Sequence, residues 1–185
     1  MNPFSITDIA KQLVGSSLQP GDHAIDATTG NGQDTLALAQ TVGSSGKVYG
    51  FDIQEEALIA TRHMLTTRNT TSQVELIQAC HSKMAEHIIK PVHAVMFNLG
   101  YLPNGNKSVT TQATTTLSAI EQAQGLLVPG GIISVVTYPG HEEGAREHQA
   151  LTTWLTENPN MQATHIKIEN RSTSAPQLFL LPSLH

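Results

Sequence analysis

Short apolar runs alternate along this chain with segments whose hydrophobic residues recur at the spacing of an amphipathic helix. The first helix is predicted to begin after Ser5, which can cap it, and to carry Ile6, Ile9, Leu13 and Val14 on one face. Further helices are expected at residues 34–42, 55–68, 83–89, 112–127 and 143–156, and strands at residues 24–27, 47–52, 74–78, 94–97 and 132–137. This alternation predicts a doubly wound α/β sheet of mostly parallel strands. Two last strands, at residues 164–169 and 177–181, have no helix between them and are expected to form an antiparallel edge hairpin.

The size of the chain predicts one packed domain over residues 1–185, because 185 residues that are 39% hydrophobic suit a single core. The apolar runs are strand-sized and fall far short of the ~20 residues that cross a bilayer. The N-terminus lacks the basic and apolar regions of a secretory signal. We therefore expect a cytoplasmic protein without a membrane span.

The charge and the metal-binding residue types exclude several classes. A net charge of −5 argues against binding nucleic acid through bulk electrostatics, although it leaves room for a local basic patch. The single cysteine, Cys80, excludes a disulfide framework and a cysteine-based zinc site. No pair among the nine histidines has compelling ligand spacing, and no Walker or G-x-S-x-G motif is present. We expect no metal.

A glycine-containing loop follows the first predicted strand, and ligands of doubly wound sheets bind where strands end. Its candidate cofactor contacts are Asp26, Thr28, Gly30, Asn31, Gly32 and Gln33. The glycines let a ligand approach the main chain. Asp52 ends the second strand, where an acid can accept hydrogen bonds from two ribose hydroxyls. The D-x-x-x-G-x-G form resembles the first motif of class I S-adenosylmethionine (SAM) methyltransferases; the alternative is a plain glycine turn.

Three more polar residues follow strands two and three. Gln54 is a candidate contact to adenosine, or else simply opens the next helix. Cys80 and His81 end the third strand, where class I enzymes often contact adenine. A His81 ring that is partly buried and bonded to a carbonyl is an equally good interpretation.

The fourth strand ends in Phe97-Asn98-Leu99-Gly100-Tyr101-Leu102-Pro103. This position matches the Asn-Pro-Pro-Tyr tetrad of methyltransferases that act on exocyclic amines, with Leu99 and Gly100 in place of the prolines. Methyl transfer to nitrogen requires a lone pair held at ~3–3.5 Å from the methyl carbon. Asn98, as an acceptor from the amine, and Tyr101, as a stacking residue, are therefore candidate catalytic residues. An ordinary turn with a buried tyrosine is the alternative.

Two loops supply the remaining candidates. His141, after the fifth strand, can act as a base or bind the substrate. Lys107 can meet a substrate phosphate, although a solvated loop lysine is the simpler interpretation. We interpret Glu143 and Glu147 as acids that complement a helix N-terminus.

Four segments together resemble one family. These are the loop from Asp26 to Thr35, Phe51-Asp52-Ile53-Gln54, Asn98-Leu99-Gly100-Tyr101-Leu102-Pro103 and Tyr138-Pro139-Gly140-His141. They are similar, in the same order, to the YtqB-type (MnmM) class I methyltransferases, long labelled rRNA methylases. The resemblance covers essentially the whole chain and implies the Rossmann-like methyltransferase fold.

The resemblance implies SAM-dependent methylation of the primary amine of 5-aminomethyl(-2-thio)uridine at the tRNA wobble position. By matching position, it implies SAM contacts from Asn31, Gln33, Asp52, Gln54 and His81. Because an aliphatic amine is mostly protonated at neutral pH, the site must favour the free base, for which His141 and the Asn98 carbonyl are candidates. The tRNA anticodon loop would be held by a surface that includes Arg62, Arg68, Lys107 and Arg146, and a homodimer would enlarge that surface.

Three other hypotheses stay open at this point. The first is a SAM methyltransferase that acts on a small-molecule amine, which the acidic charge favours, or on rRNA. The second is an NAD-binding oxidoreductase, against which the missing third glycine of G-x-G-x-x-G argues. The third is a non-catalytic SAM-binding or partner-binding module, against which Asn98 and Tyr101 argue.

Overall fold

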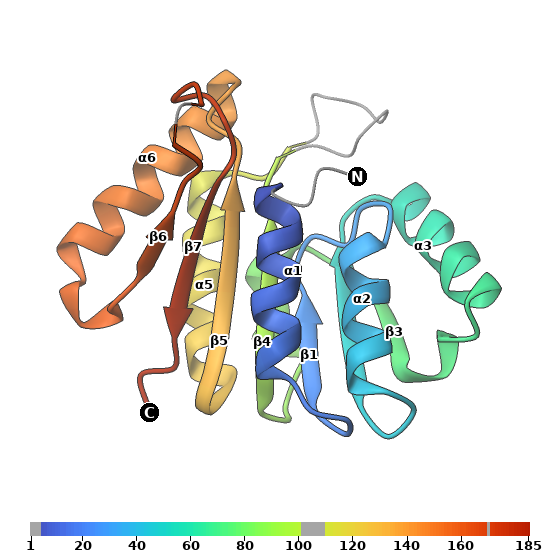
Figure 1. Cartoon of the computed structure of the whole chain (residues 1–185). Coiled ribbons are helices and arrows are strands. Elements are labelled where there is room, and N and C mark those ends of the chain that lie inside the picture. Colours follow the sequence, from blue (N-terminus) through green and yellow to red (C-terminus); the bar gives the residue numbers. More distant parts are fainter. Residues whose placement is uncertain (1–4, 101–109, 170) are drawn as a thin grey trace.

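The computed structural model describes residues 5–100, 110–169 and 171–185, and in these ranges seven strands form one sheet. The order across the sheet is β3-β2-β1-β4-β5-β7-β6 (Figure 1). The parallel strands are β1 (His23–Asp26), β2 (Lys47–Asp52), β3 (Val74–Gln78), β4 (Val92–Asn98) and β5 (Leu127–Thr137). The strand β7 (Gln177–Pro182) runs antiparallel to both β5 and β6 (Thr164–Ile166). The predicted doubly wound sheet and its antiparallel edge hairpin are confirmed.

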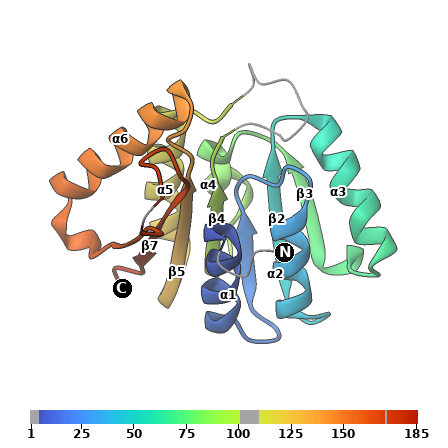
Figure 2. The ribbon, with the colours of Figure 1, turned by 45° about the horizontal axis from the view of Figure 1, so that its top comes forward.

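Helices cover both faces of the sheet, as Figures 1 and 2 show. On one face lie α1 (Ile6–Ser17) and α2 (Gln33–Val42), with α3 (Glu55–Thr67) packed beside α2 against β2 and β3. On the other lie α4 (Met84–His87), α5 (Ala113–Leu126) and α6 (Glu142–Glu157). Short 3₁₀ turns stand at Thr71–Gln73, His81–Lys83 and Pro159–Met161. No helix in the described ranges is long and apolar enough to cross a membrane.

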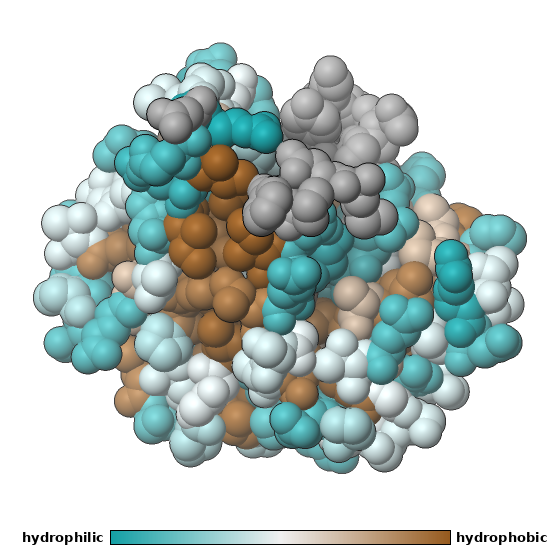
Figure 3. Space-filling view, in the orientation of Figure 1, coloured by the Kyte–Doolittle hydropathy of each residue, from teal (hydrophilic) through white to brown (hydrophobic). Residues whose placement is uncertain are grey.

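A cluster of buried hydrophobic residues fills each face of the sheet. One cluster includes Ile25, Phe97 and Ile120, and the other includes Val14 and Leu38. Burial of such side chains stabilises the fold by roughly 25 cal/mol per Å² of apolar surface. Apolar residues also gather on the face seen in Figure 3, over β5 and β7 beside α1, where Ile132, Ile166 and Leu180 are only partly buried.

Most predicted elements match the observed ones, and the differences have local causes. Ser5 caps α1 as expected, because its hydroxyl accepts from the Asp8 amide at 3.1 Å. The helix expected over 83–89 is a 3₁₀ turn followed by α4, which ends at His87, and the chain is extended at Ile88. The edge strand β6 stops at Ile166 rather than at residue 169, in keeping with the short edge strands that resist aggregation.

Candidate active site

A cavity of about 720 Å³ opens where the parallel strands end. The strand β1 lies between β2 and β4, so the chain reverses its direction of winding there, and this switch point is where doubly wound sheets bind ligands. Of the residues singled out from the sequence, those in the cavity wall are Thr28, Gly30, Asn31, Gln33, Asp52, Gln54, Cys80, His81, Asn98 and His141. Asp26, Gly32 and Arg146 do not line it, and Tyr101 and Lys107 lie outside the described residues.

Asp26 lies beneath the first loop rather than in the cavity wall. Its carboxylate is almost fully buried, and it accepts from the Thr28 amide at 3.1 Å and from the Thr35 hydroxyl at 2.6 Å. Burial, reinforced by the negative charge of Asp34, raises the pKa of Asp26. The carboxylate therefore fixes the shape of the loop from below, and a direct cofactor contact is not what its position supports.

The two glycines of the loop have different structural roles. Gly32 has a φ of +78°, and a Cβ there would lie 2.6 Å from Thr61 Oγ1, so this glycine makes room for α3. The expectation that Gly32 admits a ligand is not met by this packing. Gly30 has a φ of +52° and lines the cavity, and its carbonyl accepts from Thr61 Oγ1 at 3.0 Å. Only Gly30 of this pair presents its backbone to the cavity.

Asp52 is held in place by two backbone amides. Its Oδ2 accepts from the Gly30 amide at 2.9 Å, and its Oδ1 accepts from the Gln54 amide at 2.9 Å. A carboxylate oxygen has two lone pairs, so each oxygen retains capacity for a second donor. A rigid carboxylate in the cavity wall can accept from a pair of neighbouring hydroxyls.

The His81 ring is buried and bonded to a backbone carbonyl, which is the second of the two interpretations that the sequence left open. Its Nδ1 lies 3.1 Å from the Ala27 carbonyl, which can only accept, so Nδ1 carries the proton and Nε2 is an acceptor. Burial lowers the pKa of His81, which keeps the ring neutral.

Three buried polar atoms in the cavity wall lack hydrogen-bond partners in the described part of the chain. They are His81 Nε2, Thr29 Oγ1 and Thr110 Oγ1. Buried polar groups are normally paired. Thr29 Oγ1 faces Gly50 of β2, where a Cβ would lie 2.8 Å from it, so His81 Nε2 and Thr110 Oγ1 are the two that a polar ligand in the cavity can partner.

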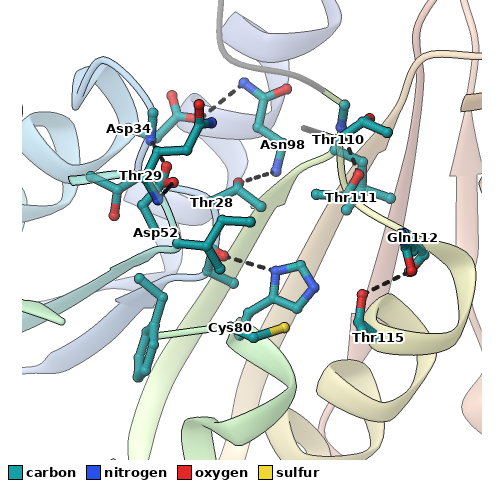
Figure 4. A pocket seen from close by; sticks show the side chains of 18 of the residues that line it. Thr28, Thr29, Asp34, Asp52, Cys80, Asn98, Thr110, Thr111, Gln112 and Thr115 are labelled. Atoms are coloured by element: carbon teal, nitrogen blue, oxygen red, sulfur yellow. Dashed lines mark hydrogen bonds between the residues drawn. The ribbon is translucent and has the colours of Figure 1, made fainter. Parts of the chain in front are cut away.

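Asn98, at the end of β4, is oriented by contacts on three sides. Its backbone amide donates to Thr28 Oγ1 at 2.7 Å, and its Nδ2 donates to Asp34 Oδ2 at 3.3 Å, as Figure 4 shows. The Tyr138 hydroxyl donates to Asn98 Oδ1 at 2.7 Å. Because a carboxylate can only accept, these partners fix which end of the amide carries the oxygen. Burial raises the pKa of Tyr138 to about 12, so its hydroxyl stays a donor.

His141 caps α6 with its ring. Its Nδ1 accepts from the Gly144 amide at 3.1 Å, which leaves Nε2 as the protonated nitrogen of the neutral ring. A ring whose acceptor atom is committed to a helix cap is poorly placed to accept a proton from a substrate. His141 lines the cavity, but this geometry argues against its predicted role as the base.

Arg146 lies on the exposed side of α6, where it bonds Glu142 at 2.6 Å and Glu143 at 2.7 Å. Two acids already balance its charge, and it is outside the cavity wall. This placement does not support the predicted substrate contact.

Glu147 lies on the buried side of α6, whereas the sequence indicates only an acid near a helix terminus. It is 2% exposed, and it accepts from Thr111 Oγ1 at 2.6 Å and from Thr116 Oγ1 at 2.7 Å. Thr111 Oγ1 in turn accepts from the Gly100 amide at 2.8 Å. Through these bonds Glu147 anchors Thr111 and Gly100, which both line the cavity. The described residues contain no group of three or more His, Cys, Asp or Glu side chains able to hold a metal ion.

The sheet order, with a cavity at its switch point, is that of the Rossmann-like methyltransferase fold, as the solved structures below also show. The chain belongs to the family described as "Putative rRNA methylase", whose model matches residues 48–182.

Solved structures match the chain over nearly its full length. A "putative rRNA-methylase" from Clostridium thermocellum has 37% identity and a TM-score of 0.94, with 98% of this chain and 99% of that chain covered. A "putative methyltransferase" from Streptococcus mutans in complex with SAH has 33% identity and a TM-score of 0.83, with 95% and 96% covered.

A chloroplastic tRNA (mnm(5)s(2)U34)-methyltransferase from Arabidopsis thaliana is 44% identical over 151 residues. That alignment covers 76% of this chain and 55% of the relative. The chain thus spans about half the length of the first curated relatives that it matches.

Proposed function

We propose that this protein transfers a methyl group from SAM to the primary amine of 5-aminomethyluridine, or of its 2-thio form, at the wobble position of tRNA. The product is the 5-methylaminomethyl nucleoside. The observation that carries the proposal is the Asn98 amide, which is fixed at the end of β4 in the cavity wall by Thr28, Asp34 and Tyr138. The name of the Arabidopsis relative supports the choice of substrate.

The cavity residues fit SAM. The Asp52 carboxylate can accept from the two ribose hydroxyls while it keeps its bonds to Gly30 and Gln54. His81 Nε2, a buried acceptor, suits a donor such as the adenine amino group. We place Asn31, in the loop before α2, and Gln33, the first residue of α2, along the rest of the cofactor. When bound, SAM supplies a methyl group on a positively charged sulfur.

Asn98 is proposed to aim the substrate nitrogen. An N–H of the amine donates to the second lone pair of Asn98 Oδ1, the first being taken by Tyr138. With one N–H fixed in this way, the nitrogen lone pair can be held in line with the methyl group, which is the main demand of such a displacement. Thr28 links this position to the first loop, so the two halves of the site keep a constant spacing.

The substrate comparison that tests the proposal uses SAM with a labelled methyl group and two tRNAs that differ only at the wobble uridine. We expect transfer to the tRNA with the 5-aminomethyl group and none to the tRNA with unmodified uridine. Equal transfer to both, or transfer only to small amines, would contradict the proposal.

A variant test addresses Asn98 itself. Asn98→Ala is expected to lose at least ~100-fold in turnover with an unchanged dissociation constant for SAM, because the amide orients only the substrate. Asn160→Ala is the matched control, because Asn160 is exposed and remote from the cavity. Near-normal turnover of Asn98→Ala would remove Asn98 from the amine site.

A further inference from the structure

We propose that Asp34 is a catalytic residue of this site: its carboxylate receives the protonated amine of the substrate and takes the proton that must leave before methyl transfer. The inference rests on the proposed function, since it concerns how an aliphatic amine is made reactive. It also gives the site a reason to prefer such an amine over the neutral amino group of a nucleobase.

The position of Asp34 carries the argument. It lies in the first turn of α2, is 9% exposed and stands in the cavity wall. Figure 4 shows its carboxylate and the Asn98 amide turned toward one another, with 3.3 Å between Asp34 Oδ2 and Asn98 Nδ2. A substrate ammonium that donates to Asn98 Oδ1 therefore lies close to the Asp34 carboxylate.

Asp34 is weakly partnered for a buried acid. Its hydrogen bond to Asn98 is long, and Lys11 Nζ lies 3.9 Å from Asp34 Oδ1 but only 3.2 Å from Asp8 Oδ1. A carboxylate offers about four acceptor positions, and a buried one is costly unless those positions are used. A primary ammonium carries three donors on a compact charge and can use them.

The charges of the cavity wall point to the same ligand. Its described residues include two carboxylates, Asp34 and Asp52, and no lysine or arginine. Asp52 is bound on both oxygens by the amides of Gly30 and Gln54. Asp34 is the one of these two carboxylates that is hydrogen-bonded to Asn98.

The neighbouring groups are less suited to take the proton. The Nδ1 of His141 accepts from the Gly144 amide, and an amide oxygen such as that of Asn98 is a very weak base. The Tyr138 hydroxyl is a donor to Asn98. Asp34 is thus the group in this part of the wall with a basic oxygen next to the proposed amine position.

The charged surroundings tune Asp34 as a base. Burial raises its pKa, and the negative charge of Asp8 on α1 acts in the same direction. Lys11, also on α1, and the hydrogen bond from Asn98 lower the pKa of Asp34. The other titratable groups that interact with Asp34 are Asp26 and Tyr138. A raised pKa brings the carboxyl closer to the working pH, where a general base is most effective.

The proposed step balances as follows. One N–H bond of the ammonium breaks, its proton goes to an Asp34 oxygen, and its electron pair stays on nitrogen. That pair then forms the N–C bond to the methyl group while the methyl–sulfur bond breaks with its electrons going to sulfur. The products are neutral SAH and a secondary ammonium, and Asp34 returns its proton to solvent.

The test compares the wild type with Asp34→Asn on tRNA that carries 5-aminomethyluridine, over a range of pH. Asp34→Asn keeps the shape and an acceptor for Asn98 but has no basic oxygen. Near neutral pH we expect kcat/KM to fall ~100-fold or more. The remaining activity should then rise about tenfold per pH unit toward the pKa of the free substrate amine, because the free amine must come from solution. The dissociation constant for SAM should stay within about twofold of the wild type.

A matched control and a second variant keep the test decisive. Glu121→Gln changes an exposed acid of α5 to its amide and should leave both the rate and the pH profile unchanged. If Asp34→Asn does not fold, Asp34→Ser is judged by the same three measurements: the rate near neutral pH, the pH profile and the dissociation constant for SAM. A wild-type pH profile in the variant overturns the inference, and so does an inactive variant that binds SAM but gains nothing at high pH. Failure of the wild type itself to methylate this tRNA would instead contradict the proposed function.

Discussion

The backbone amide of Asn98 donates a hydrogen bond of 2.7 Å to the hydroxyl of Thr28. This contact joins the loop after β1 to the end of β4 across the switch point of the sheet (Figure 4). The two loops that are proposed to hold the methyl donor and the methyl acceptor are therefore parts of one hydrogen-bonded unit. Small errors in such spacing are expected to affect rate more than affinity, because methyl transfer depends on close alignment.

Replacing Thr28 with valine should separate the two loops without changing the size of the side chain. The Asn98 amide loses its acceptor, so we expect a loss of about 1–3 kcal/mol in the free energy of unfolding and a clear drop in kcat. Urea unfolding and a methyl-transfer assay measure the two effects. Thr28→Ser, which keeps the hydroxyl, is the control and should behave nearly as the wild type. Equal behaviour of the valine and serine variants would show that the bond is unimportant.

Asp52→Ala should weaken SAM binding by at least about tenfold, because charge-assisted hydrogen bonds contribute roughly 1.5–3 kcal/mol each. The variant also leaves the Gly30 and Gln54 amides without their acceptor. Isothermal titration with SAM measures the change, and Glu56→Ala, an exposed acid in the first turn of α3, serves as the control. An unchanged dissociation constant would exclude Asp52 from the ribose contact.

Glu147→Ala should destabilise the protein by about 2–3 kcal/mol, because a buried and a partly buried hydroxyl donor lose their acceptor. We also expect reduced turnover with SAM affinity retained, since Glu147 reaches the cavity through Thr111 and Gly100 rather than through the first loop. Unfolding by urea and steady-state kinetics provide the readouts. On the same helix, Glu143→Ala removes only an exposed ion pair with Arg146 and should cost under ~1 kcal/mol. Similar losses in both variants would contradict the anchoring role of Glu147.

His81 should make both stability and SAM binding sensitive to acid. Because the folded state lowers the pKa of His81, the stability it contributes is present above the unfolded value of about 6.5 and is lost as pH falls through the folded value. Protonation also removes the acceptor at Nε2. The midpoint temperature of thermal unfolding should therefore fall between about pH 7 and about pH 5. The fall should be smaller in His81→Asn, because the asparagine amide can still donate to Ala27 but does not titrate.

Burial also lowers the pKa of His23 and His148, and these rings contribute to the same decline. The difference between wild type and His81→Asn isolates the share of His81. Parallel pH curves for the two proteins would contradict the assigned protonation of its ring.

The sheet could be predicted from the sequence because apolar runs and helical periodicity are local signals. The bounds of β2 and β3 match residues 47–52 and 74–78, and the ends of the strands located Asp52 and Asn98 in the cavity wall. Position along a strand, together with the rule that ligands bind where parallel strands end, was enough for these residues.

The partners of those residues could not be predicted, because they come from distant segments. Asp34 is 64 residues from Asn98, and Tyr138 is 40 residues from it. Asp34 had one local signal, its place directly after the glycine loop, while Glu147 had none beyond a helix terminus. The ring nitrogens of His81 and His141 also took their roles from Ala27 and Gly144, which only the folded structure specifies.

The most direct test of the central claim is mass spectrometry of the nucleosides from a tRNA with 5-aminomethyluridine at its wobble position, after incubation with this protein and SAM. We predict that the wobble nucleoside gains the mass of one methyl group, that the gain follows a deuterated label on SAM, and that it is absent when SAM is omitted. No gain on that nucleoside, in a preparation shown to bind SAM, would contradict the account.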